Sequence, residues 1–181
     1  IYGPSVPHML GAPHQRPTSP DNQHITPIKA HGLSANSIGF LMDEDNATIW
    51  RGPMASSALS QLLNETLWDS LDYLVIDMPP GTGDIQLTLS QQIPVTGAVV
   101  VTTPQDIALL DAVKGVSMFE RVSVPVLGIV ENMSMHICSN CGHHEPIFGT
   151  GGAEKMAQKY NVKVLGQLPC LLYTSDAADD K

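Results

Sequence analysis

The stretch that decides the fold is Tyr73-Leu74-Val75-Ile76-Asp77-Met78-Pro79-Pro80-Gly81-Thr82-Gly83-Asp84. Its first half is a short apolar run that ends in a carboxylate, and two prolines follow almost at once. Because proline cannot continue a central strand, the pattern predicts a buried strand that stops abruptly at a loop. A carboxylate in that place is typical of a Walker B site, where Asp77 would hold Mg²⁺ through water. The equally open alternative is that Asp77 caps the next element and that the prolines only stiffen the loop.

The sequence on either side of this stretch predicts alternating strands and helices. Downstream, apolar runs predict buried strands at 97–102, 126–130 and 162–165, and amphipathic spacing predicts helices at 105–121 and 152–160. Upstream, the spacing of apolar residues predicts a helix near 56–67, and 37–42 with 47–50 suggests a hairpin. The order predicts an α/β fold in which a parallel sheet carries helices on both faces. Such sheets bind ligands at the carboxyl ends of their strands.

Two cysteines at metal-binding spacing form the second chemical signal. The sequence Cys138-Ser139-Asn140-Cys141-Gly142 is followed by His143 and His144. Two thiolates are half of what structural zinc or a cubane iron–sulfur cluster requires. The spacing therefore leaves four alternatives open: a zinc site completed by the histidines, a cluster shared by two chains across a twofold axis, a redox dithiol, or no metal.

Composition limits the class of protein and its partners. The chain has 181 residues, a net charge of −9 and three cysteines. So much negative charge disfavours non-specific binding to nucleic acid or to an anionic membrane, and we expect neither as a partner. An odd number of cysteines argues against a disulfide framework and favours a reducing, cytoplasmic setting. The glycine-rich stretch 148–152 lacks the Lys-Ser/Thr ending of a Walker A loop, so it predicts a bend before a helix.

Several motifs, taken together and in order, resemble the Mrp/ApbC iron–sulfur carrier ATPases, which are MinD-like P-loop proteins with a deviant Walker A motif. The resemblance runs from Ile1 to about Pro169. The segments that carry it are Tyr2-Gly3-Pro4-Ser5, Trp50-Arg51-Gly52-Pro53, residues 77–84, Thr103-Pro104-Gln105, Glu131-Asn132-Met133-Ser134, the cysteine pair and Phe148-Gly149-Thr150-Gly151-Gly152.

The resemblance implies a cytoplasmic homodimer that receives a [4Fe–4S] cluster from a donor and passes it to apo iron–sulfur proteins. It assigns the bridging cluster to Cys138 and Cys141. It assigns Mg²⁺, held through water, to Asp77. It assigns the γ-phosphate of ATP to the loop containing Pro80, Gly81 and Asp84, and adenine to Asn132. A carboxamide suits adenine because it both donates and accepts hydrogen bonds.

The chain also departs from the family pattern. No Gly-x-x-x-x-Gly-Lys-Ser/Thr motif occurs in the 181 residues. We therefore expect an incomplete P-loop NTPase domain at 1–169 that does not hydrolyse ATP at a useful rate as given. We expect residues 170–181 to be a non-native or disordered tail.

Two rival functions accompany the carrier hypothesis. One is a monomeric zinc-knuckle binding module without ATPase activity, which would use Cys138, Cys141, His143 and His144. The other is a fragment without metal or nucleotide binding.

Overall fold

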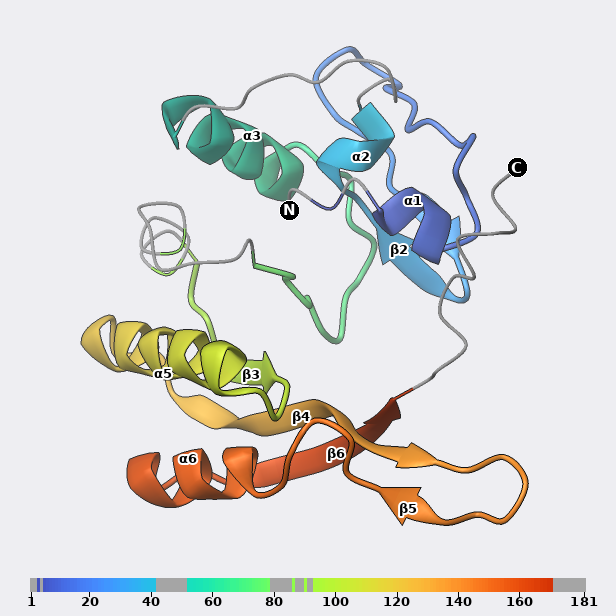
Figure 1. The fold of residues 1–181 in the computed structure, drawn as a ribbon. Helices are drawn as coiled ribbons and strands as arrows, with labels where there is room; N and C mark the ends of the chain where they lie inside the picture. Colours follow the sequence, from blue (N-terminus) through green and yellow to red (C-terminus); the bar gives the residue numbers. More distant parts are fainter. Residues whose placement is uncertain are drawn as a thin grey trace. The chain divides into compact units, whose positions relative to one another are not determined.

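The computed structural model describes residues 3, 5–41, 52–78, 86, 90 and 93–170. The chain divides into two compact units, Ile1–Gln92 and Ile93–Lys181 (Figure 1). In the described part, no helix combines the length and the apolar character that crossing a membrane requires.

Within its described residues between 3 and 78, the first unit contains three helices and a small hairpin. Its elements are α1 (Val6–Met9), β1 (Ile28–Ala30), β2 (Leu33–Ala35), α2 (Ile38–Leu41) and α3 (Gly52–Asn64). Strands β1 and β2 pair antiparallel around His31 and Gly32, which both have positive φ, as a two-residue hairpin turn requires. Phe40 is fully buried and packs with Ala12 and Ile28.

Two predicted strands of this unit are wrong. The stretch 37–42 contains the helical turn α2, and Ile38 and Phe40 are buried as residues of that turn. Residues 42–50, which include the second strand of the expected hairpin, lie outside the described part. The run Tyr73–Asp77 has no regular secondary structure, and Tyr73 and Val75 are 88% and 89% exposed. A strand requires a hydrogen-bonding neighbour, and the strands described in this unit, β1 and β2, pair with each other.

The second unit is the predicted α/β sheet. Its elements are β3 (Ala98–Thr102), α5 (Asp106–Arg121), β4 (Val126–Ile137), β5 (His144–Glu145), α6 (Gly152–Tyr160) and β6 (Val164–Cys170). Strand β4 is central, with β3 and β6 parallel to it on its two edges, and β5 pairs antiparallel with its last residues. The strands predicted at 97–102, 126–130 and 162–165 and both helices are confirmed, although β4 and β6 extend further than expected.

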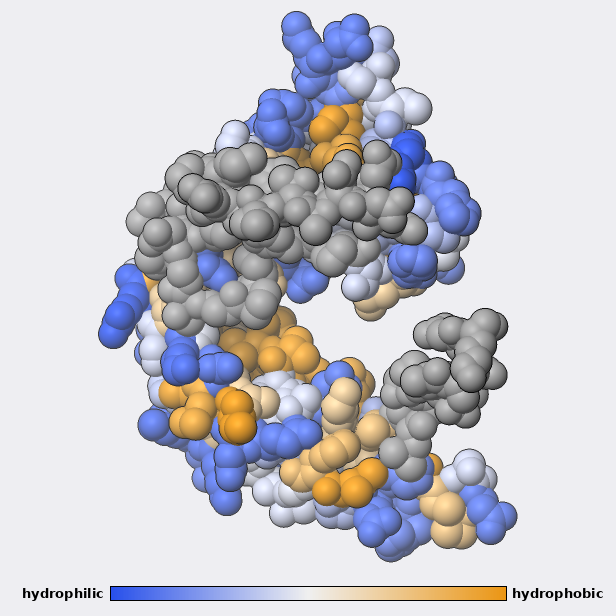
Figure 2. Space-filling view, turned by 45° about the horizontal axis from the view of Figure 1, so that its top comes forward, coloured by the Kyte–Doolittle hydropathy of each residue, from blue (hydrophilic) through white to orange (hydrophobic). Residues whose placement is uncertain are grey.

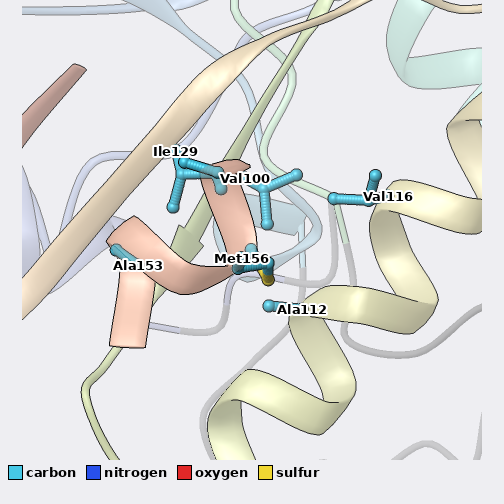
Figure 3. Packing of buried hydrophobic residues seen from close by; sticks show 7 residues of the cluster. Val100, Ala112, Val116, Ile129, Ala153 and Met156 are labelled. Carbon is cyan, nitrogen blue, oxygen red and sulfur yellow. The ribbon is translucent and has the colours of Figure 1, made fainter. Parts of the chain in front are cut away.

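Helices α5 and α6 pack against one face of this sheet. Val100 and Ile129 point from the strands toward Ala112, Val116, Ala153 and Met156 on the helices (Figure 3). Gly128 lets β6 approach closely, because a Cβ there would lie 2.5 Å from the Leu165 side chain. On the opposite face the apolar side chains of Val99, Val101, Leu127 and Leu165 are exposed. Figure 2, in which hydrophobic residues are orange, shows such residues at the surface of the molecule.

Candidate functional site

Both predicted cluster cysteines lie at the tip of a β-hairpin. The last residues of β4 pair with β5, so that His136 faces Glu145 and Ile137 faces His144. The backbone N–H of Cys138 donates to the carbonyl oxygen of His143 at 2.9 Å. The N–H of Gly142 donates to the carbonyl oxygen of Cys138 at 2.8 Å. The hairpin extends away from α5 and α6 (Figure 1), which makes its tip accessible to another molecule.

The turn favours the thiolate form of Cys138. The backbone N–H of Cys141, then that of Asn140 and the Cys141 side chain, lower the pKa of the Cys138 thiol below its ordinary value. Partial burial and the Glu145 carboxylate act in the opposite direction and do not overcome these donors. Hydrogen bonds to a sulfur stabilise its negative charge, and the thiolate is the form that binds metal. The left-handed φ of +71° at Gly142 permits the tight turn that provides these donors.

The described surroundings of the two cysteines supply no third ligand. Cys138 is partly exposed, and Cys141, His143 and His144 are exposed. Across the described ranges, no three or more His, Cys, Asp or Glu side chains form a group that could hold a metal ion. A zinc site completed by the two histidines within one chain therefore has no support in this geometry. The third cysteine, Cys170, lies on β6 opposite His136, and all three cysteines are free thiols.

Asn132, the predicted adenine contact, lies on β4 in the same unit as the cysteines. Its side-chain oxygen accepts a 2.9 Å hydrogen bond from the N–H of Met133, which has a φ of +55°. The side-chain NH₂ group of Asn132 can donate to a ligand, and the oxygen keeps a second lone pair that can accept.

Sequence reasoning missed a buried carboxylate next to Asn132. The Glu131 side chain is 1% exposed. It accepts hydrogen bonds from the Ser134 hydroxyl at 2.9 Å, the Ala153 N–H at 3.0 Å and the Gln167 amide at 3.2 Å. Ala153 is in the first turn of α6, and the N-cap residue of this helix, Gly151, makes no side-chain hydrogen bond to it. Glu131 therefore accepts from a backbone N–H that has no partner within the helix. The sequence signal that could have revealed this buried carboxylate is its position, because Glu131 directly follows the apolar run 126–130.

The predicted phosphate and magnesium residues are only partly described. Asp77 is exposed and lies in the first unit, after a stretch without regular secondary structure. Pro80, Gly81 and Asp84 lie outside the described residues. The structure thus places Asn132 within β4 and Cys138 and Cys141 in the hairpin turn that follows the same strand. The adenine, cluster, magnesium and γ-phosphate roles of the predicted residues all stay predictions. The stretch 148–152 is the expected bend before a helix: Gly149 and Gly151 have positive φ, and α6 begins at Gly152.

Comparisons with protein families and with curated proteins find relatives that are described as iron-transfer proteins or iron–sulfur cluster carriers. The family model ParA, described as NUBPL iron-transfer P-loop NTPase, matches residues 1–181. The chain is 94% identical over 169 residues to an iron-sulfur cluster carrier protein of Haemophilus influenzae, a match that covers 93% of the chain and 46% of that relative. It is 76% identical to the carrier protein of Escherichia coli K12, with the same coverage of both chains.

More distant relatives carry related names. The mouse iron-sulfur cluster transfer protein NUBPL is 50% identical over 179 residues, which cover 99% of this chain and 56% of the mouse protein. The chain thus spans about half the length of the curated relatives it matches. A solved nucleotide-binding protein from Archaeoglobus fulgidus, in complex with ADP and with Co, superposes with a TM-score of 0.77 at 35% identity. That match covers 94% of this chain and 66% of the other, and it confirms the α/β P-loop fold.

Proposed function

The chain belongs to the family of NUBPL-type iron-transfer P-loop NTPases, and from that membership we propose that it carries iron–sulfur clusters and transfers them to apo-proteins. The single observation that supports this most directly is the hairpin tip, which presents two cysteines to the outside and stabilises the thiolate of Cys138. A carrier has to hold its cargo firmly enough to travel and openly enough to release it. An exposed two-cysteine turn meets both demands better than a closed four-ligand site does.

The cargo that we propose is a [4Fe–4S] cluster shared by two copies of the chain. A cubane cluster takes about four thiolates, and one hairpin offers Cys138 and Cys141. A second copy related by a twofold axis would supply the other two, because an isologous interface presents the same residues from both sides. The proposal therefore includes a homodimer in which the two hairpin tips meet at the cluster.

We propose that ATP and Mg²⁺ bind to the whole protein and control the state of the cluster. Asn132 would donate its side-chain N–H to adenine, and Asp77 would hold Mg²⁺ through water. The loop with Pro80, Gly81 and Asp84 would contact the γ-phosphate. The ADP complex of the similar Archaeoglobus fulgidus protein supports nucleotide binding. Asn132 and the cysteines share strand β4 and its hairpin, so a change at the nucleotide has a short covalent path to the cluster.

The partners in this proposal are a cluster donor and apo iron–sulfur proteins, with no nucleic acid and no membrane among them. A cytoplasmic location suits the three free thiols, because a reducing compartment keeps them available for iron. The net charge of −9 supports the exclusion of nucleic acid, since phosphate groups would repel such a surface.

Cluster transfer tests the proposed function. The protein is reconstituted anaerobically, separated from free iron, and mixed with the apo form of a [4Fe–4S]-dependent dehydratase, whose activity reports the arrival of the cluster. We expect activity to return with the wild-type chain and with Cys170→Ser, and to stay absent with Cys138→Ser or Cys141→Ser. Equal recovery with all four proteins would show that free iron and sulfide restore the enzyme, and the carrier function would be rejected.

A further inference from the structure

Strand β4 contains a bulge that includes Asn132, the residue proposed for adenine, and that precedes the cysteines. Glu131 pairs with Gln167 of β6, and the next pair is Met135 with Pro169. Strand β4 advances by four residues between these pairs while β6 advances by two, so β4 carries two extra residues there. The left-handed conformation of Met133 belongs to this irregularity, and it is unfavourable for a residue with a side chain. A bulge of this kind bends a strand and redirects the residues beyond it.

A side-chain hydrogen bond between Glu131 and Ser134 spans the bulge. The Ser134 hydroxyl donates to Oε2 of Glu131 at 2.9 Å, and both side chains are buried. Oε1 of the same carboxylate accepts the N–H of Ala153, which ties it to α6. Glu131 is therefore fixed to the core of the unit, and Ser134 fixes the far end of the bulge to Glu131.

The hairpin depends on this attachment for its direction. Beyond the bulge, only Met135 and His136 of β4 pair with β6, and β5 is a two-residue strand paired with His136 and Ile137. In the described part of this unit, β4 is the element that packs closely on β5. The cysteine-bearing tip is thus held by the course that β4 takes as it leaves the bulge.

We propose that Glu131 and Ser134 are positioning residues for the cluster, which set the direction of the Cys138–Cys141 hairpin by closing the bulge in β4. The inference rests on the proposed function only for the identity of the cargo. A carboxylate is required because both of its oxygens face hydrogen-bond donors; the amide of a glutamine would place a donor against one of them. Gln167 donates to the same oxygen as Ser134, but it does so from β6, opposite Glu131, and its removal leaves the bond between Ser134 and Glu131 in place. It therefore provides the matched control.

The test compares wild type, Ser134→Ala and Gln167→Ala, all in the full chain. Hydrogen–deuterium exchange measures the hairpin amides of residues 136–145 in the metal-free protein. Release of iron to bathophenanthroline disulfonate and the electron paramagnetic resonance spectrum of the reduced cluster measure the reconstituted protein. For Ser134→Ala we expect hairpin exchange and iron release to be faster by about threefold to tenfold, the usual effect of one lost hydrogen bond, together with an altered spectrum. We expect Gln167→Ala to match wild type in all three.

The outcomes separate this inference from the proposed function. Exchange in α5 and α6 serves as the internal reference, because a merely destabilised fold would speed exchange there as well. Unchanged hairpin exchange in Ser134→Ala, or an equal increase in Gln167→Ala, would overturn the positioning role. A wild-type chain that takes up no cluster would instead reject the carrier function, while the exchange data would still decide the role of the bulge.

Discussion

The backbone N–H of Cys138 lies 2.9 Å from the carbonyl oxygen of His143, and this hydrogen bond closes the turn that contains Cys141. The bond fixes the backbone so that the N–H groups of Asn140 and Cys141 face the sulfur of Cys138. The backbone of the turn therefore lowers the pKa of the Cys138 thiol, which favours the thiolate form that would bind metal. Cys138 is the cysteine of the pair on which these donors converge.

The first prediction concerns the pH dependence of thiol reactivity. Because the pKa of Cys138 is lowered, its thiolate persists to lower pH than that of an ordinary cysteine. In a Cys170→Ser background, Cys141→Ser leaves Cys138 as the single thiol, and we expect its alkylation by iodoacetamide to reach half its maximal rate below the pH found for an unstructured cysteine peptide. Unfolding the protein in urea should remove the difference. A midpoint equal to that of the peptide in the folded protein would contradict the role of the turn.

The second prediction concerns Gly142. Its φ of +71° is costly for any residue with a Cβ, although nothing within 4 Å would clash with the new atom. We expect Gly142→Ala to weaken the closed turn by about 1 kcal/mol and to reduce iron uptake. Hydrogen exchange of the Cys138 and Gly142 amides and iron content after reconstitution are the measurements.

Gly115→Ala is the matched control for Gly142→Ala. Gly115 lies inside α5, has no positive φ and also has free space where the new Cβ would lie. In a helix interior this change should stabilise the protein by about 0.5 to 1 kcal/mol and leave iron uptake unchanged. If both variants lose iron to the same extent, the effect of Gly142→Ala does not come from its left-handed backbone.

The third prediction concerns the core beneath the site. Ile129 is fully buried between the sheet and α6 and lies two residues before Glu131. We expect Ile129→Ala to lower the free energy of unfolding by about 2 to 5 kcal/mol, because it leaves a cavity, and Ile129→Val by about 0.5 to 1.5 kcal/mol. Urea denaturation followed by circular dichroism measures both. If Ile129→Ala lowered the free energy of unfolding by less than Ile129→Val does, the core around Ile129 would be less tightly packed than the structure indicates.

The fourth prediction separates the cluster from zinc. His143 and His144 are exposed and belong to no group of metal ligands among the residues that the structure describes. The double variant His143→Ala/His144→Ala should therefore reconstitute with the iron and sulfide content of wild type. Loss of bound metal in this variant, measured by elemental analysis, would favour the zinc-knuckle module.

The second unit was largely predictable from the sequence because its signals are local. The apolar runs and helical spacing between Ala98 and Val164 are strong, and each matches the element that forms. The extension of β4 beyond Val130 was not predictable in this way, since Glu131, Asn132 and Ser134 look like a loop. Glu131 and Ser134 are held in the bulged strand by the hydrogen bond between their side chains and by the bond that Glu131 accepts from Ala153, which is distant in sequence.

The structure of the first unit was poorly predicted from the sequence. Tyr73–Asp77 has the composition of a buried strand, but composition does not supply the neighbouring strand that its hydrogen bonds require. Ile38 and Phe40 alternate as in a strand, yet they form one helical turn whose side chains are buried. The hairpin of β1 and β2 was missed although His31-Gly32 is a signal for a two-residue turn. Of the site, the cysteine pair could be found by spacing, whereas Glu131 acts through contacts that spacing does not reveal.

The most direct test of the central claim is the metal content and mass of the anaerobically reconstituted protein, measured by native mass spectrometry for wild type, Cys138→Ser and Cys170→Ser. We predict a brown dimer with about two irons and two sulfides per chain in wild type and in Cys170→Ser, and a metal-free protein in Cys138→Ser. A colourless monomer with about one zinc per chain would contradict the shared-cluster carrier.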